Sequence, residues 1–158
     1  GIDADCLFLL EAPGPRAVES GFVSRNNPDE TAKSFMLLNE AAGIARSRTV
    51  VWNIVPWYIG SGQRIRPATG KDIDEGWPYV VRLLDLLPRV AVAVLVGRKA
   101  QRVRRHFVAL RPDVAVFDCP HPSPLFVNRL PANREVVVEA LRAVAAALPG
   151  RLYAPGAA

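Results

Sequence analysis

Four short apolar runs, separated by helical patterns, are the feature that most constrains the fold of this chain. The runs are Cys6–Leu10, Thr49–Val55, Val90–Val96 and Val114–Asp118. They are continuous and rich in β-branched residues, which is typical of strands covered on both faces. Because these strands alternate with helical segments, the sequence predicts a three-layer α/β/α fold around a central four-stranded parallel sheet.

Four helices are expected around these strands, over about residues 28–42, 72–87, 98–110 and 132–148. We expect Asn27 to cap the first of them, with Pro28 at its first position and Gly43 at its end. Pro78 is expected to interrupt or to start the second, because proline removes a helical hydrogen bond. The remaining residues form loops between these elements.

The size and composition of the chain favour a single domain. The sequence has 158 residues, half of them hydrophobic, which is enough for a substantial core. We expect one domain over residues 1–150 and a Gly/Pro/Ala-rich tail over 151–158. No apolar stretch is long enough to cross a bilayer, so we expect no membrane association. We also expect a monomer.

Charge and cysteine usage indicate the kind of partner and compartment. The formal net charge of +5 favours a polyanionic partner such as nucleic acid. Cys6 and Cys119, the two cysteines, have no metal-ligand spacing and no disulfide framework to join. We therefore expect no metal site and a reducing, cytoplasmic setting of bacterial type.

A polar residue or a glycine lies at or just after the end of each of the four predicted strands. Glu11 follows the first, Asn53 lies near the end of the second, Gly97 follows the third and His121 follows the fourth. In a parallel sheet the carboxyl ends of the strands meet at one edge, and ligands bind beyond that edge. The sequence therefore predicts that these residues meet in one site.

Several motifs, taken in order, resemble the uracil-DNA glycosylase superfamily. They are Glu11-Ala12-Pro13-Gly14, Gly21-Phe22-Val23-Ser24, Trp52-Asn53-Ile54-Val55-Pro56 and His121-Pro122-Ser123-Pro124. The resemblance covers nearly the whole chain and is greatest to the iron–sulfur "family four" branch. It implies the fold expected above and DNA as the partner.

This chain departs from that branch in three ways. Family four holds its cluster with four cysteines, whereas this chain has two, so we expect no iron–sulfur cluster and no cofactor. Leu10 stands where the family has glycine. An insertion over residues 25–33 contains no histidine, the residue that DNA-trapping relatives use, so we expect ordinary turnover.

The resemblance implies roles for individual residues at the base pocket. Glu11 would orient water or act on the sugar cation, Asn53 would read the edge of uracil, and His121 would donate to uracil O2 as charge develops. Phe22 would stack on the flipped base. Two loop residues would complete the uracil-binding pocket, Ala12 and Gly14.

The loop after His121 is expected to contact DNA. Leu125 and Phe126 stand where relatives insert an apolar wedge into the stack emptied by the flipped base. Ser123 and Arg129 are expected to contact flanking phosphates.

The expected function is monofunctional excision of uracil from DNA, which releases free uracil and leaves an abasic site. Two alternatives remain open: a glycosylase for hypoxanthine or a T/U mismatch, and a catalytically weak uracil-DNA-binding module. Gly14 stands where a tyrosine blocks the thymine methyl in the best-known branch, so thymine exclusion is not assured. Ala12 stands where that branch has its water-activating aspartate, which leaves Glu11, Asp29 or Glu30 for that role.

Two other enzyme classes are excluded. A phosphate-binding nucleotide site would need a glycine-rich loop after the first strand, whereas this loop has two prolines. A serine hydrolase would need a nucleophile elbow, and the sequence has no Gly-x-Ser-x-Gly.

Overall fold

A computed structural model describes residues 1–24, 27–62 and 64–150 of the chain; the predicted tail over 151–158 lies outside them. Its central sheet has four parallel strands in the order β2-β1-β5-β6, which confirms the predicted fold class. The strands are β1 (Cys6–Leu10), β2 (Thr49–Asn53), β5 (Val92–Val96) and β6 (Ala115–Cys119).

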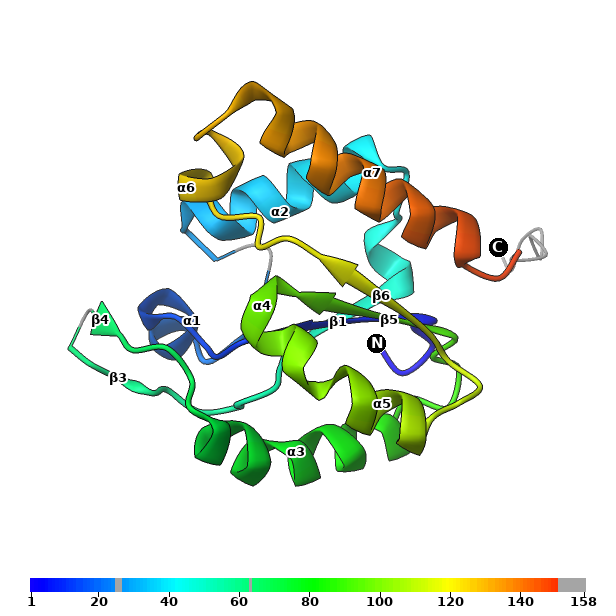
Figure 1. Cartoon of the computed structure of the whole chain (residues 1–158), viewed down its shortest axis with the longest axis horizontal. Helices are drawn as coiled ribbons and strands as arrows, with labels where there is room; N and C mark the ends of the chain where they lie inside the picture. Colours follow the sequence, from blue (N-terminus) through cyan, green and yellow to red (C-terminus); the bar gives the residue numbers. More distant parts are fainter. Residues whose placement is uncertain (25–26, 63, 151–158) are drawn as a thin grey trace, which may run out of the picture.

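Helices cover both faces of this sheet (Figure 1). One face packs against α2 (Glu30–Ala41), α6 (Pro124–Val127) and α7 (Pro131–Ala147), and the other against α3 (Gly70–Asp85), α4 (Gly97–Ala100) and α5 (Arg104–Leu110). Side chains alternate along β1, so that Leu7 and Leu9 enter one core and Cys6 and Phe8 the other. Both faces are thus buried, which explains the continuous apolar runs.

The start of α2 differs from the prediction. Asp29 caps this helix, because its Oδ1 accepts a hydrogen bond from the backbone N–H of Ala32 at 2.8 Å. Asn27 was expected to do so, but its Nδ2 donates instead to the carbonyl of Phe22 at 2.9 Å. Asparagine and aspartate are about equally good caps for the unpaired N–H groups of the first helical turn, so the sequence alone does not indicate which of the two residues caps the helix.

Two other helices also differ from expectation. α3 begins at the Thr69 cap and continues through Pro78, which lies on its exposed side. The helix expected over 98–110 is divided into α4, a 3₁₀ turn at Gln101–Val103 and α5. Residues three apart lie in line in a 3₁₀ turn, which stacks Ala100 over Val103, both fully buried.

Five short elements were not predicted. They are α1 (Pro15–Ser20), the 3₁₀ turn Arg46–Arg48, α6 and the two strands of an antiparallel hairpin, β3 (Gly60–Ser61) and β4 (Arg64–Ile65). A segment over residues 66–69, called the strap below, then joins this hairpin to α3. Over the described part of the chain, no helix is long and apolar enough to span a membrane.

Candidate functional site

The carboxyl ends of the four strands meet at one edge of the sheet. Leu10 and Asn53 are paired at the ends of β1 and β2, and Val96 and Cys119 at the ends of β5 and β6. Beyond β2 the backbone N–H of Ile54 donates to the carbonyl of Leu10 at 2.8 Å, which keeps the two following loops together. This arrangement fixes the backbone on which the predicted site residues stand.

A cavity of about 550 Å³ opens at this edge. The predicted site residues that line it are Glu11, Ala12, Gly14, Asn53, His121 and Ser123. A Cβ built on Gly14 would meet no atom within 4 Å, so the cavity is open at this position. One wall of the cavity also contains three residues of the hairpin and the strap, which are Ile65, Arg66 and Pro67. These residues were not predicted from the sequence.

Asn53 presents an unused carboxamide to this cavity. The residue is only 3% exposed, yet its side chain makes no hydrogen bond within residues 1–24, 27–62 and 64–150. Its amide atoms still reach the solvent in the cavity, since neither is among the fully buried, unpartnered side-chain atoms of the described chain. The carboxamide is thus available to donate to and accept from a ligand.

His121 lies against the chain that follows β5. A Cβ built on Gly97 would lie 3.3 Å from Cβ and 3.4 Å from Cδ2 of His121, so the imidazole packs directly on the glycine. Gly97 also has a φ of +83°, a conformation that other residues rarely adopt. The position therefore suits glycine for two reasons, its backbone conformation and the closeness of the ring.

Burial lowers the pKa of His121 below its ordinary value, because the charged imidazolium loses solvation. The negative charge of Glu11 acts in the opposite direction and raises it, but less strongly. The ring is accordingly neutral near pH 7 and retains one N–H donor. A neutral histidine and a nearby carboxylate thus share the cavity.

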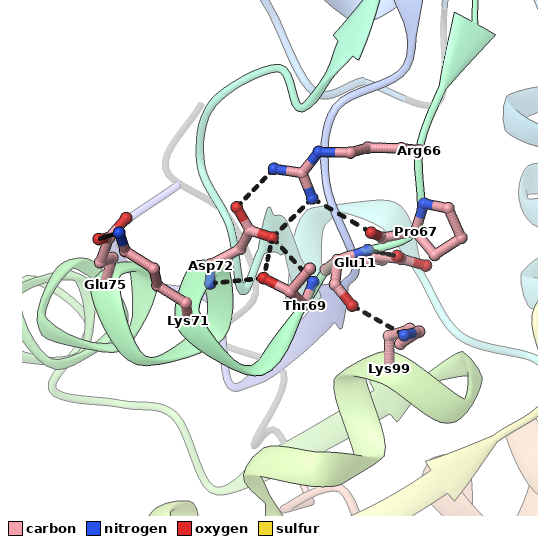
Figure 2. Close-up of polar contacts among 9 residues, drawn as sticks. Glu11, Arg66, Pro67, Thr69, Lys71, Asp72, Glu75 and Lys99 are labelled. Carbon is pink, nitrogen blue, oxygen red and sulfur yellow. Dashed lines mark hydrogen bonds and ion pairs between the residues drawn. The ribbon is translucent and has the colours of Figure 1, made fainter.

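Glu11 is held by the strap (Figure 2). Its Oε1 accepts a hydrogen bond from the backbone N–H of Ala68 at 2.5 Å. The carbonyl of Ala68 accepts another from Nζ of Lys99 on α4 at 2.7 Å. The strap therefore connects the loop after β1 with the helix after β5.

Arg66 and Asp72 fix the same strap to α3 (Figure 2). Arg66 donates from both terminal nitrogens to the Asp72 carboxylate, at 2.7 and 2.8 Å. Asp72 also forms a capping box with Thr69 at the start of the helix. The hydrogen bonds from Arg66 and Thr69 hold the pKa of Asp72 well below its usual range. The carboxylate therefore stays ionised and keeps the ion pair intact.

Several predicted residues lie outside the cavity lining. Phe22 is 73% exposed, and Leu125 on α6 is 89% exposed. Arg129 is also exposed, whereas Phe126 is partly buried against the core beneath α7. The structure therefore brings Ser123 together with the residues expected to act on the base, but not Phe22, Leu125, Phe126 or Arg129.

The two alternative acids are placed differently from Glu11. Asp29 lines the cavity but is engaged as the cap of α2, and Glu30 is exposed in the first turn of that helix. Residues 25 and 26 of the predicted insertion lie outside the described part of the chain.

The described cysteines do not suit a four-cysteine cluster. Cys6 and Cys119 are both buried, on strands that β5 separates, and they lie at opposite ends of the sheet. Burial raises the pKa of Cys119 to about 12, so its thiol stays protonated. The described residues contain no group of three or more histidine, cysteine or acidic side chains that could hold a metal.

Comparison with known proteins identifies the family. The sequence profile of the family described as "Uracil DNA glycosylase superfamily" matches residues 1–145. The chain belongs to the uracil DNA glycosylase superfamily. No curated protein sequence matches the chain significantly.

Solved structures share the fold of this chain. One of them is wild-type SMUG2 from Pedobacter heparinus, which superposes with a TM-score of 0.58 at 11% sequence identity. The match covers 91% of this chain and 76% of that one. At this identity the likeness concerns the fold alone.

Proposed function

We propose that this uracil DNA glycosylase superfamily member removes uracil from DNA by hydrolysing its N-glycosidic bond. The observation that carries this proposal is the carboxamide of Asn53, which makes no hydrogen bond within the described chain and lines the same cavity as His121 and Glu11. The target base must leave the stack to reach such a site, because its glycosidic bond is inaccessible in the duplex. The products are free uracil and an abasic site.

Asn53 supplies base recognition in this proposal. Its amide oxygen accepts from uracil N3–H, and its amide nitrogen donates to O4. Cytosine presents the opposite donor and acceptor at these positions, so a fixed carboxamide disfavours it. The net gain in free energy from each such hydrogen bond is modest, about 0.5–1.5 kcal/mol, because uracil replaces water on the amide, so the contact supplies mainly selectivity.

His121 and Glu11 supply the chemistry. As the bond between C1′ and N1 breaks, positive charge develops on the sugar and negative charge on the leaving uracil. The neutral imidazole donates to uracil O2, where this negative charge develops. Glu11 stabilises the sugar cation and orients the water, whose oxygen bonds to C1′ and whose released proton balances the uracil anion.

Contacts with DNA come from residues around the mouth of the cavity. Leu125 is the apolar wedge, and its exposure is consistent with that role, because a solvated leucine gains from burial in a base stack. Phe22 reaches the flipped base by a rotation of its exposed side chain, and Ser123 and Arg129 contact phosphates.

A second candidate function is excision of other bases, and Gly14 favours it. No atom lies within 4 Å of the position that its Cβ would take, so nothing there excludes a larger base or a 5-methyl group. Thymine in a mismatch and hypoxanthine are therefore the first substrates to compare with uracil.

One assay tests both candidates. Oligonucleotides carrying uracil, a T mismatch or hypoxanthine are incubated with the protein, and abasic sites are cleaved by alkali before electrophoresis. Strand cleavage at uracil supports the proposal, and cleavage only at another base supports the second candidate. Retention of uracil-containing DNA without any abasic product would instead indicate a binding module and refute both.

A further inference from the structure

Both backbone polar groups of Ala68 form hydrogen bonds with charged side chains, which come from the loops after two different strands. Its N–H donates to Glu11 and its carbonyl accepts from Lys99, at 2.5 and 2.7 Å. Ala68 itself is only 1% exposed. Glu11 follows β1 and Lys99 follows β5, and these strands are neighbours, so the strap crosses the gap between their ends (Figure 2).

The charge of Lys99 is not neutralised by an ion pair within the described chain. The side chain is partly buried, and among the described residues its ammonium has no carboxylate within salt-bridge distance. Its recorded hydrogen bond goes to a backbone carbonyl instead. Partial burial of an ammonium group costs free energy unless its interactions offset that cost. The hydrogen bond to the carbonyl of Ala68 is the interaction that offsets it here.

The contact with Ala68 bears directly on the orientation of Glu11. One carboxylate oxygen, Oε1, is fixed by the Ala68 N–H, and Oε2 has no hydrogen-bond donor in the described chain. A glutamate held through one oxygen keeps the other available for water or for the sugar. If Ala68 moves, that geometry is lost, and a misplacement of about 1 Å can lower a rate on the order of a hundredfold.

We propose that Lys99 is a positioning residue for Glu11 and acts through the backbone of Ala68. This inference rests on the proposed function, because it assigns to Lys99 the task of holding the carboxylate that acts on water and the sugar. The remainder of the strap is fixed independently of Lys99, by the Arg66–Asp72 ion pair and the Thr69 cap. Loss of the ammonium should therefore loosen Ala68 without unfolding α3.

The first test measures the amide hydrogen exchange of Ala68 by NMR in the free protein. Lys99→Met keeps most of the aliphatic stem and removes the donor. Exchange of the Ala68 amide should then become on the order of tenfold faster, because its local opening is easier. Lys99→Arg, which restores a cationic donor, should bring exchange back towards the wild-type rate. Lys71→Met is the matched control, since Lys71 is an exposed lysine 3.8 Å from Glu75 and remote from Ala68 in its contacts.

The second test measures single-turnover excision of uracil with saturating enzyme. Lys99→Met should lower the rate on the order of tenfold, within the range expected for misplacement of a catalytic group. The same substitution in a Glu11→Gln background should lower it little further, because residues that act as a unit have non-additive effects. Lys71→Met should leave the rate unchanged.

A third measurement distinguishes positioning from a direct contact with DNA. If Lys99 bound a phosphate, Lys99→Met would reduce the slope of log affinity against log salt concentration by about one. We expect an unchanged slope. A reduced slope, an unchanged Ala68 exchange rate or additive losses with Glu11→Gln would each overturn the inference.

The two proposals can fail separately. If the wild-type protein excises no uracil but the Ala68 amide still responds to Lys99→Met, the positioning of Glu11 stands and the proposed substrate is wrong. If the protein excises uracil and the Ala68 amide does not respond, the proposed function stands and Lys99 has no positioning role.

Discussion

Replacement of Gly97 by alanine should damage the site more than it damages the fold. The new methyl group would lie 3.3 Å from Cβ of His121, which is closer than a relaxed contact, so the imidazole must shift by a few tenths of an ångström. The φ of +83° adds backbone strain. Gly43→Ala is a matched control, because Gly43 has a similar φ of +76° and no atom within 4 Å of its built Cβ.

The expected losses in the free energy of unfolding follow from the backbone strain and from the crowding against His121. A non-glycine residue in the left-handed region costs about 1–2 kcal/mol, part of which is offset because alanine restricts the unfolded chain. We therefore expect Gly43→Ala to lower the free energy of unfolding by about 1 kcal/mol. Crowding against His121 adds about 1–2 kcal/mol for Gly97→Ala, at the lower end of the cost of overpacking. For a domain of this size, each 1 kcal/mol lowers Tm by about 2–4 °C.

Single-turnover kinetics separate the effect on the site from the effect on stability. Gly97→Ala should lower the excision rate on the order of tenfold, less than the loss of about a hundredfold or more expected when the donor itself is removed. Gly43→Ala should excise at the wild-type rate at temperatures well below its Tm. If Gly97→Ala is also as fast as the wild-type protein, the glycine does not position His121 and the reasoning from the close contact is refuted.

Four further predictions concern the same site. Excision should proceed fully in excess EDTA, and a strict requirement for a metal ion would contradict the proposed chemistry. Asn53→Asp should leave the fold intact, as judged by circular dichroism, but lose uracil excision, because a carboxylate cannot donate to O4; normal activity would show that Asn53 does not read the base. His121→Ala should lower the single-turnover rate roughly a hundred- to a thousandfold, with little change in DNA affinity, and a tenfold loss of affinity at a normal rate would indicate a structural histidine. Burial lowers the pKa of His121 in the folded protein, so the unfolded chain binds a proton at this residue first as the pH falls below about 6.5. The free energy of unfolding of the wild-type protein should therefore fall relative to that of His121→Ala below this pH. A difference between the two proteins that does not depend on pH would contradict the lowered pKa.

The strands and the grouping of Glu11, Asn53 and His121 could be predicted because the signals are local and physically simple. Continuous β-branched runs predict strands buried on both faces, and parallel strands bring the residues that follow them to one edge. The shift of β2, which ends at Asn53 instead of Val55, does not alter this result. The placement of the site therefore tolerates errors of two residues in strand boundaries.

The hairpin and the strap could not be predicted by the same reasoning. β3 and β4 have two residues each, too few for any periodicity to appear in the sequence. The contact between Lys99 and Ala68 joins residues 31 positions apart, and the one between Glu11 and Ala68 spans 57 positions. No local pattern encodes such pairs, which depend on how the loops fold over the completed sheet.

The order of the strands also sets the width of the site. Asn53 stands on β2 and His121 follows β6, which are the two outer strands of the sheet, with β1 and β5 between them. Neighbouring strands lie about 4.8 Å apart, so the axes of β2 and β6 are separated by about 14 Å. This separation is a property of backbone hydrogen bonding in a four-stranded sheet and does not depend on the side chains at the edge. Replacement of the side chains at this edge can therefore change the shape of the cavity while the span between the two outer strands stays constant.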